Sequence, residues 1–116
     1  MSERPHKLIL LDMLDAIDGI ETFVAGMSEQ DYLADAKTQA AVERYLEILG
    51  EAANLFPESF YMRFNHIKWH RLISLRNRII HAYFAVNDAI VWDIVTNYLP
   101  GLKYELTTIL NNFDAV

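Results

Sequence analysis

The sequence predicts an all-α protein, built as an up-and-down four-helix bundle with short extra helical turns. Apolar residues recur at helical spacing through almost the whole chain of 116 residues, and the 4 glycines and 3 prolines are too few and too scattered for a pattern of strands and turns. The main segments have the length of bundle helices, and the connections between them are short. We therefore expect one helical domain that spans residues 1–116.

The first two helical segments are placed by their end signals. Pro5 is a residue favoured in a first turn, so the first helix is expected from Pro5 to about Ala25, with Gly26 ending it. Its inward stripe is predicted as Leu8, Leu11, Ile17, Ile20 and Val24. Ser28 followed by Asp31 three residues later resembles a capping box, which predicts a short helical piece after the first connection.

The remaining helices follow the same logic. A second long helix should run from Asp35 to about Phe56, and residues 57–64 should form one extra turn. The predicted inward face of the second long helix is Val42, Leu46, Leu49 and Ala53. A third helix is expected over residues 68–80. The last, over residues 87–112, should be kinked or interrupted at Pro100, because proline removes a backbone donor.

Composition narrows the class of protein. The uncharged stretches are too short or too polar to cross a bilayer, there is no signal-peptide pattern, and there are no cysteines for a disulfide or a thiolate metal site. We therefore expect a cytoplasmic protein with no membrane association. A hydrophobic content of 53% is high for a small domain, which favours an oligomer interface.

Positive charge is concentrated in one window of an otherwise acidic chain with net charge -6. Residues 59–87 contain no Asp or Glu, yet they hold half of the Lys and Arg residues. These cations are Arg63, Lys68, Arg71, Arg76 and Arg78, and the histidines of the same window are His66, His70 and His81. Such asymmetry indicates a local anion site, with Arg71 and Arg78 as candidate substrate-binding cations.

The chemistry concentrates between residues 76 and 83. Arg76 carries a permanent cation that can bind phosphate oxygens, and His81 titrates near neutrality. His81 could accept the proton of an RNA 2′-hydroxyl, while Arg76 stabilises charge on the non-bridging oxygens of the phosphate. Asn77 could orient His81 or donate to phosphate, and Tyr83 could hold the phosphate or the leaving oxygen. These groups predict metal-independent RNA cleavage that needs no cofactor, with catalytic residues Arg76, His81 and Asn77.

The spacing of this motif creates a geometric problem. Arg76 and His81 are five residues apart, which separates them by about 140° around a straight helix. Either the helix unwinds before His81, or two copies of the motif meet across a dimer axis to form a composite site; we favour the second. A structural interpretation also fits, in which an Arg and a His near a helix C-terminus only complement the helix dipole.

The string Arg76-Asn77-x-Ile79-x-His81-x-Tyr83 resembles the R-x4-H-x-Y signature of HEPN ribonucleases, specifically the HepT-like toxins that pair with MntA-type minimal nucleotidyltransferase antitoxins. Other parts that resemble the same family are the segment 41–52 with its Gly50-Glu51-Ala52, Trp69, Asp93 and Leu99-Pro100. The resemblance covers nearly the whole chain. It implies a HEPN-like bundle, a homodimer with both motifs lining one cleft, and tRNA or mRNA as substrate.

The resemblance also implies regulation within a type VII-like toxin–antitoxin pair. In that family the partner nucleotidyltransferase can attach AMP to the tyrosine of the H-x-Y element, which here is Tyr83. A second hypothesis, of a different class, is a catalytically silent HEPN-like module that only docks a nucleotidyltransferase.

Two other patterns attract attention. His66 and His70 are four residues apart and could chelate a metal from one helix face, but no carboxylate lies nearby in the sequence, so we expect no metal site. Arg44 and Glu51 are expected to hold the helix pair together or to brace the motif.

Overall fold

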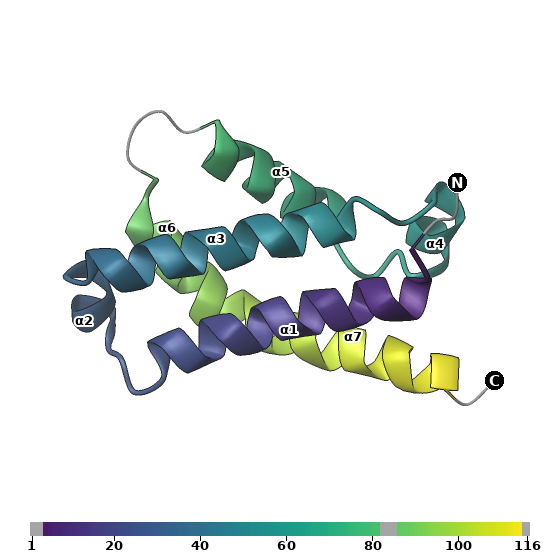
Figure 1. Cartoon of the computed structure of the whole chain (residues 1–116), viewed down its shortest axis with the longest axis horizontal. Coiled ribbons are helices and arrows are strands. Elements are labelled where there is room, and N and C mark those ends of the chain that lie inside the picture. The colour runs from purple at the N-terminus through teal and green to yellow at the C-terminus, as the bar shows by residue number, and fades with distance from the viewer. Residues whose placement is uncertain (1–3, 82–85, 115–116) are drawn as a thin grey trace.

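The structure is a computed structural model that describes residues 4–81 and 86–114. Its elements are α1 (His6–Val24), α2 (Glu29–Leu33), α3 (Ala36–Ala53), α4 (Glu58–Arg63), α5 (Trp69–Ile80), α6 (Asp88–Asp93), the π-helical segment η1 (Ile94–Tyr98) and α7 (Leu99–Asp114). The predicted all-α bundle is confirmed, because every element in those two ranges is helical. Figure 1 shows the long helices running in alternating directions.

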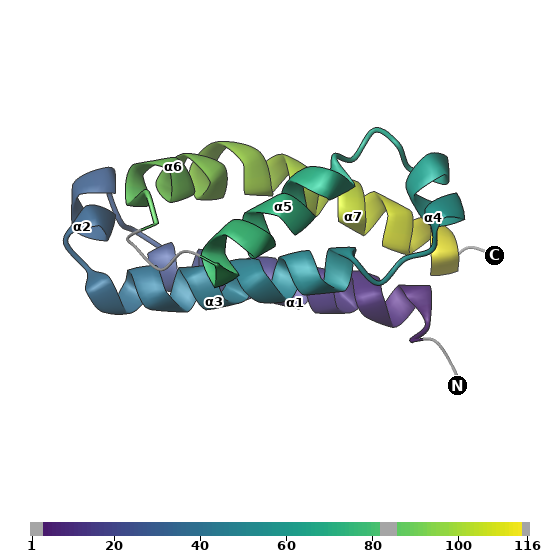
Figure 2. The ribbon, with the colours of Figure 1, turned by 90° about the horizontal axis from the view of Figure 1, so that it is seen from above.

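Three helix pairs hold the bundle together. α1 packs along α3, α3 packs along α5, and α1 also packs against α7. Figure 2 shows α1 and α3 side by side in one layer, α6 and α7 opposite them, and α5 crossing obliquely. The short α2 and α4 lie at opposite ends of the molecule (Figure 1). None of the helices within the described ranges is long and apolar enough to cross a membrane.

The predicted end signals of the first half are confirmed. Gly26 follows α1 with a φ of 77°, a left-handed conformation that favours glycine. The Ser28 side chain accepts from the backbone N–H of Asp31 at 3.1 Å, and Asp31 accepts in return from the N–H of Ser28 at 3.0 Å, which completes the capping box. Asp35 caps α3 by accepting from the N–H of Thr38 at 3.0 Å.

The inward stripe predicted for the first helix was partly wrong. Leu8 is 40% exposed and Leu11 is only half-buried. The buried residues of α1 are Ile9, Leu10, Met13, Ala16, Ile17 and Ile20. Because α1 packs against both α3 and α7, its buried face is wider than one stripe and is displaced from the predicted one. The stripe predicted on the second long helix is confirmed, since all four of its residues are buried, although α3 ends three residues before Phe56.

The interruption predicted in the last helix is present, and it lies just before Pro100. The backbone N–H of Leu99 donates to the carbonyl oxygen of Ile94, a bond across five residues that defines a π turn. Proline lacks an N–H, and its ring crowds the carbonyl four residues earlier, so a widened turn at this position relieves the conflict. Pro100 itself lies in the first turn of α7.

Candidate active site

The motif is carried by α5, which remains helical up to His81. The backbone N–H of His81 donates to the carbonyl oxygen of Asn77 at 3.0 Å, so His81 keeps helical register as the C-cap residue. The alternative in which the helix unwinds before His81 is therefore wrong for this chain. Arg76 and His81 are left on different sides of one intact helix.

Arg76 lies half-buried against α3, at a close approach of the two helices. A Cβ atom on Gly50 of α3 would collide with the Cβ atom of Arg76 and come within 2.7 Å of the carbonyl oxygen of Leu72. Only glycine lets α5 approach α3 this closely. The Arg76 Nε atom is buried and has no hydrogen-bond partner among the described residues. A buried guanidinium donor without a partner is costly, and an anion would satisfy it.

The other motif residues are solvent-facing or outside the described part of the chain. Asn77 and His81, four residues apart, share an exposed face of α5. Tyr83, predicted as the AMP acceptor, lies outside the described residues. The structure thus brings Asn77 and His81 together and holds Arg76 apart from them.

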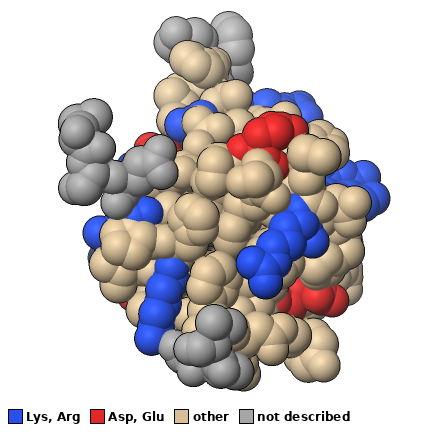
Figure 3. Space-filling model, turned by 90° about the vertical axis from the view of Figure 1, so that its right-hand side faces the viewer, with Lys and Arg blue, Asp and Glu red and all other residues tan. Residues whose placement is uncertain are grey.

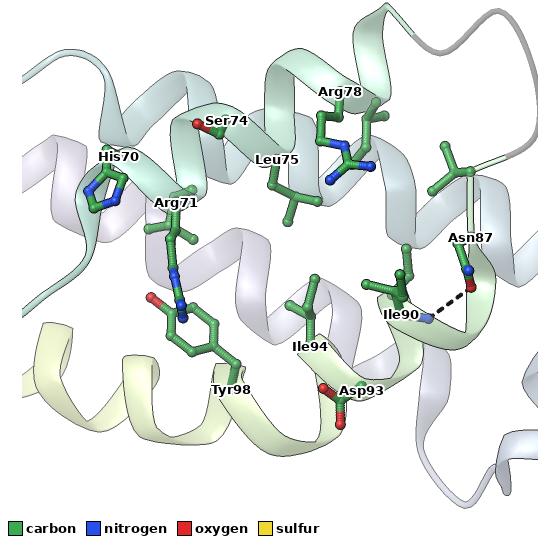
Figure 4. A pocket seen from close by; sticks show the side chains of 14 residues that line it. His70, Arg71, Ser74, Leu75, Arg78, Asn87, Ile90, Asp93, Ile94 and Tyr98 are labelled. Atoms are coloured by element: carbon green, nitrogen blue, oxygen red, sulfur yellow. Dashed lines mark hydrogen bonds between the residues drawn. The ribbon is translucent and has the colours of Figure 1, made fainter.

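A groove of about 750 Å³ lies between α5 and the α6–η1 segment. From α5 it is lined by Arg71, Ser74, Leu75 and Arg78, which share one face at helical spacing. The opposite wall contains Asn87, Ile90, Asp93, Ile94 and Tyr98. In Figure 4, Arg71 extends across the groove to the Tyr98 ring, and Arg78 points into it from the next turns of the helix.

The groove is positively charged on its α5 side. Within the described part of the chain, neither Arg71 nor Arg78 forms an ion pair with a carboxylate. Asp93, on the opposite wall, accepts a hydrogen bond from the Asn97 amide at 2.6 Å. Burial raises the pKa of the Tyr98 phenol above its ordinary value, and the nearby Arg71 cation partly offsets that shift. Tyr98 therefore stays neutral and presents a hydroxyl and a ring face.

The cationic window of the sequence does not form a single patch in one chain. Arg76 packs against α3, whereas Arg71 and Arg78 line the groove. Figure 3, which faces the end of the molecule near α4, shows Lys and Arg side chains spread over the surface with Asp and Glu between them. The positive potential predicted from the sequence is therefore divided between two faces of α5.

The groove was missed from the sequence, apart from its two arginines. One signal was present, since Arg71, Ser74, Leu75 and Arg78 recur at the spacing of a single helix face. The opposite wall comes later in the sequence, and it lies beside α5 only because of how α6 is placed in the fold. No local sequence pattern predicts that placement.

Two of the other predicted features can be placed. His66 pairs with Glu105 of α7 at 3.0 Å, whereas His70 faces the groove. No group of three or more His, Asp or Glu residues between residues 4 and 81 or 86 and 114 is arranged to hold a metal ion. In the described part of the chain, the ion pair of Arg44 is with Glu47 of the same helix, at 2.9 Å, and not with a second helix.

Comparison with known proteins identifies the family. The family model described as "Ribonuclease HepT-like" matches residues 13–109. The chain belongs to the HepT-like ribonuclease family. A protein of Thermococcus cleftensis named "Probable ribonuclease HepT" is 41% identical over 101 residues, which is 87% of this chain and 92% of that protein. A Methanocaldococcus jannaschii protein named as a "Putative RNase" is 35% identical over 115 residues, covering 99% of this chain and 95% of the relative. No solved structure gives a significant match.

This HepT-like chain is accordingly an RNA-cleaving enzyme. The matched region contains all of α5, His81 and both walls of the groove. Of the two hypotheses drawn from the sequence, family membership supports the enzyme over the catalytically silent module.

Proposed function

We propose that this chain is a metal-independent endoribonuclease that cuts RNA by attack of a 2′-hydroxyl on the adjacent phosphorus. His81 accepts the proton of the 2′-hydroxyl, and the 2′-oxygen forms a new bond to phosphorus. The bond from phosphorus to the 5′-oxygen breaks, that oxygen takes up a proton from water, and His81 releases its proton to solvent before the next cycle. The products are a 2′,3′-cyclic phosphate and a 5′-hydroxyl end. Arg76 stabilises the charge that develops on the non-bridging oxygens.

The observation that supports this proposal also favours a composite site. Because α5 keeps helical register up to His81, Arg76 and His81 of one chain point about 140° apart around the helix and present poorly to one phosphate. A two-fold axis beside α5 would place Arg76 of one subunit near His81 of the other, and the shared cleft of a homodimer would then hold two complete sites. The phosphate would supply an acceptor for the Arg76 guanidinium, whose Nε has no partner within residues 4–81 and 86–114.

Asn77 supports His81 from the same helix face. Its backbone carbonyl oxygen already accepts the His81 N–H at 3.0 Å, which fixes the spacing between the two residues. Its side-chain amide is exposed and can donate to phosphate or hold the imidazole in one tautomer. Asn77 is therefore assigned as the residue that orients the base.

The biological role follows from the same family pattern. We propose a cytoplasmic toxin of a type VII-like pair, acting on tRNA or mRNA and silenced by an MntA-type nucleotidyltransferase that attaches AMP to Tyr83. Tyr83 lies two residues beyond His81, so AMP at its phenol would add negative charge beside the bound phosphate. Modified Tyr83 would compete with RNA for Arg76.

Chelation and two substitutions test the chemistry. Purified protein should cleave RNA in the presence of EDTA, and Arg76→Ala or His81→Ala should each reduce the rate about 10²-fold or more. His66→Ala is the matched control, since it removes an exposed histidine outside the motif that pairs with Glu105. A variant of either motif residue that keeps more than about a tenth of wild-type activity would remove that residue from the mechanism.

Mixing the two inactive variants tests the composite site. A mixed dimer of Arg76→Ala and His81→Ala chains contains one site with both wild-type residues and one site with neither. After subunit exchange at equal concentrations, about a quarter of wild-type activity should return. If the mixture stays inactive although mixed dimers form, each site is built from one chain.

Modification of Tyr83 is tested with the cognate nucleotidyltransferase and ATP. Mass spectrometry should find AMP on the peptide that contains Tyr83, and Tyr83→Phe should escape silencing. Tyr104→Phe is the control, because Tyr104 is 71% exposed and is therefore an accessible competing acceptor. AMP on Tyr104, or full silencing of Tyr83→Phe, would show that Tyr83 is not the regulatory residue.

A further inference from the structure

We infer that the groove between α5 and α6–η1 holds the RNA strand that flanks the cut. This inference rests on the proposed function, and it assigns a substrate-binding surface outside the motif. It would make the enzyme favour single-stranded RNA that extends beyond the two nucleotides at the scissile bond.

The charges of the groove fit a polyanion. Arg71 and Arg78 are seven residues apart on one helix face, which separates their Cα atoms by about 10.5 Å along the axis. Both enter the groove, and neither is neutralised by a carboxylate in the described ranges. Two free guanidinium groups in a row can bind successive parts of a phosphate backbone.

The walls of the groove fit nucleobases. Leu75 on one side and Ile90 and Ile94 on the other form an apolar lining, and the Tyr98 ring closes one end (Figure 4). Single-stranded RNA is bound by stacking unpaired bases on aromatic and arginine planes. Arg71 extends toward Tyr98 in the groove, so a guanidinium and an aromatic ring are both available to a nucleotide there (Figure 4).

The groove also leads to the catalytic base. Arg78 and His81 are three residues apart, and the intact helix places them about 60° apart in azimuth, compared with about 140° for Arg76 and His81. An RNA strand with its 2′-hydroxyl at His81 can therefore continue past Arg78 toward Arg71. At the rim, the Asn87 side-chain oxygen caps α6 by accepting from the N–H groups of Ala89 and Ile90, which leaves its NH₂ group for a base edge.

A second copy of the chain is a less suitable occupant. A symmetric dimer that closed groove on groove would bring two copies of Arg71 and Arg78 together, with only one Asp93 from each chain to offset them. Like charges in a shared interface oppose association, whereas RNA complements them.

The test compares two substrates in cleavage assays at several salt concentrations. One substrate is a dinucleotide that contains only the scissile phosphate, and the other is a single-stranded oligonucleotide of about twelve nucleotides. Arg71→Gln and Arg78→Gln should each raise the oligonucleotide KM about tenfold relative to the dinucleotide KM. In the inactive His81→Ala background, each should also reduce the salt slope of oligonucleotide binding by about 0.7. Arg44→Gln is the matched control, because Arg44 is exposed and pairs only with Glu47.

The possible failures are distinguishable. If the wild type cleaves neither substrate, the proposed chemistry fails. If the wild type cleaves both but the groove variants change both KM values equally or not at all, the groove inference is overturned. The inference is also overturned if light scattering shows that Arg71→Gln or Arg78→Gln separates a dimer into monomers, since the groove would then be a subunit interface.

Discussion

α1 and α5 both pack along α3, yet they are held there in different ways. α1 buries six of its 19 residues and also packs on α7, where Lys103 bridges Asp18 at 3.0 Å and Glu21 at 2.8 Å. α5 buries only three of its 12 residues, and its packing is mainly on α3; neither helix has a side-chain N-cap. The helix that carries the motif is therefore the less extensively anchored of the two, and its position depends strongly on one close contact with α3.

A glycine lies at a close contact in each pair, and the two glycines differ in what they face. A Cβ atom on Gly19 of α1 would collide with the Tyr45 ring, including Cε1 at 2.6 Å, which is the far end of a side chain that can turn away. A Cβ atom on Gly50 would meet the Arg76 Cβ atom and the Leu72 backbone, which can move only if α5 moves. The second contact positions the candidate site, whereas the first one serves packing alone.

The largest effect is expected for Gly50→Ala. Displacement of α5 should lower the free energy of unfolding by about 1–3 kcal/mol, even though alanine favours helix. Because Arg76 would move with the helix, RNA cleavage should fall by about tenfold or more. Urea unfolding and a cleavage assay measure the two effects. Wild-type stability and activity in this variant would show that α5 is not positioned by this contact.

The next prediction concerns the N-cap of α3, the helix on which α1 and α5 both pack. Hydrogen bonds from the backbone and side chain of Thr38 lower the pKa of Asp35 below its ordinary value. A lowered carboxyl pKa contributes stability above the unfolded-state pKa, and this contribution is lost as pH falls through the folded-state value. Asp35→Asn keeps a capping oxygen but loses the charge, so the stability gap between wild type and variant should shrink below about pH 4. Urea unfolding midpoints of both proteins from pH 7 to pH 2 measure this stability gap. A gap that does not change with pH would exclude a contribution from the Asp35 charge.

A smaller effect is expected for Lys103→Met, which removes the ion pairs between α7 and α1. All three side chains of this cluster are more than 40% exposed, so water screens the attraction and the loss should stay below about 1 kcal/mol. The loss should also decrease in high salt. A salt-independent loss of several kcal/mol would mean that α1 depends on these ion pairs rather than on its apolar face.

The smallest effect is expected for Gly19→Ala, the matched control for Gly50. Rotation of the half-buried Tyr45 ring should relieve the contact, while alanine raises helix propensity by up to about 1 kcal/mol. Stability should thus change by less than about 1 kcal/mol, and cleavage should be unaffected. A loss as large as that of Gly50→Ala would remove the distinction between the two contacts.

The helices and their ends were predictable because each is encoded locally. Capping by Ser28 and Asp35, the glycine after α1 and the chemistry of Pro100 all act within a few residues of the chain. The inward face of α1 was harder to predict, because its second partner, α7, is distant in the sequence. The same reason hid the groove, one wall of which begins at Val86.

The candidate catalytic residues were named from their chemistry, and their relative placement was partly predictable from helix geometry. The azimuthal separation of Arg76 and His81 followed from their spacing, and the intact end of α5 agrees with it. The burial of Arg76 against Gly50 was not predictable, because it depends on the distance between two helices. Tyr83 lies outside the described residues, so its proposed role rests on the sequence motif.

The π turn at Ile94–Tyr98 makes the effect of a deletion in the last part of the chain depend on its position. A π turn holds one residue more than an α-helical turn, so five residues here cover the rotation that four residues cover in an α-helix. Removing one residue of this segment would allow an uninterrupted α-helix and would leave α6 at the same azimuth relative to α7. Removing one residue from α6 would instead rotate the part of the chain before it by about 100° relative to α7. The start of the groove wall would then turn while the core stripe of α7 stayed in place.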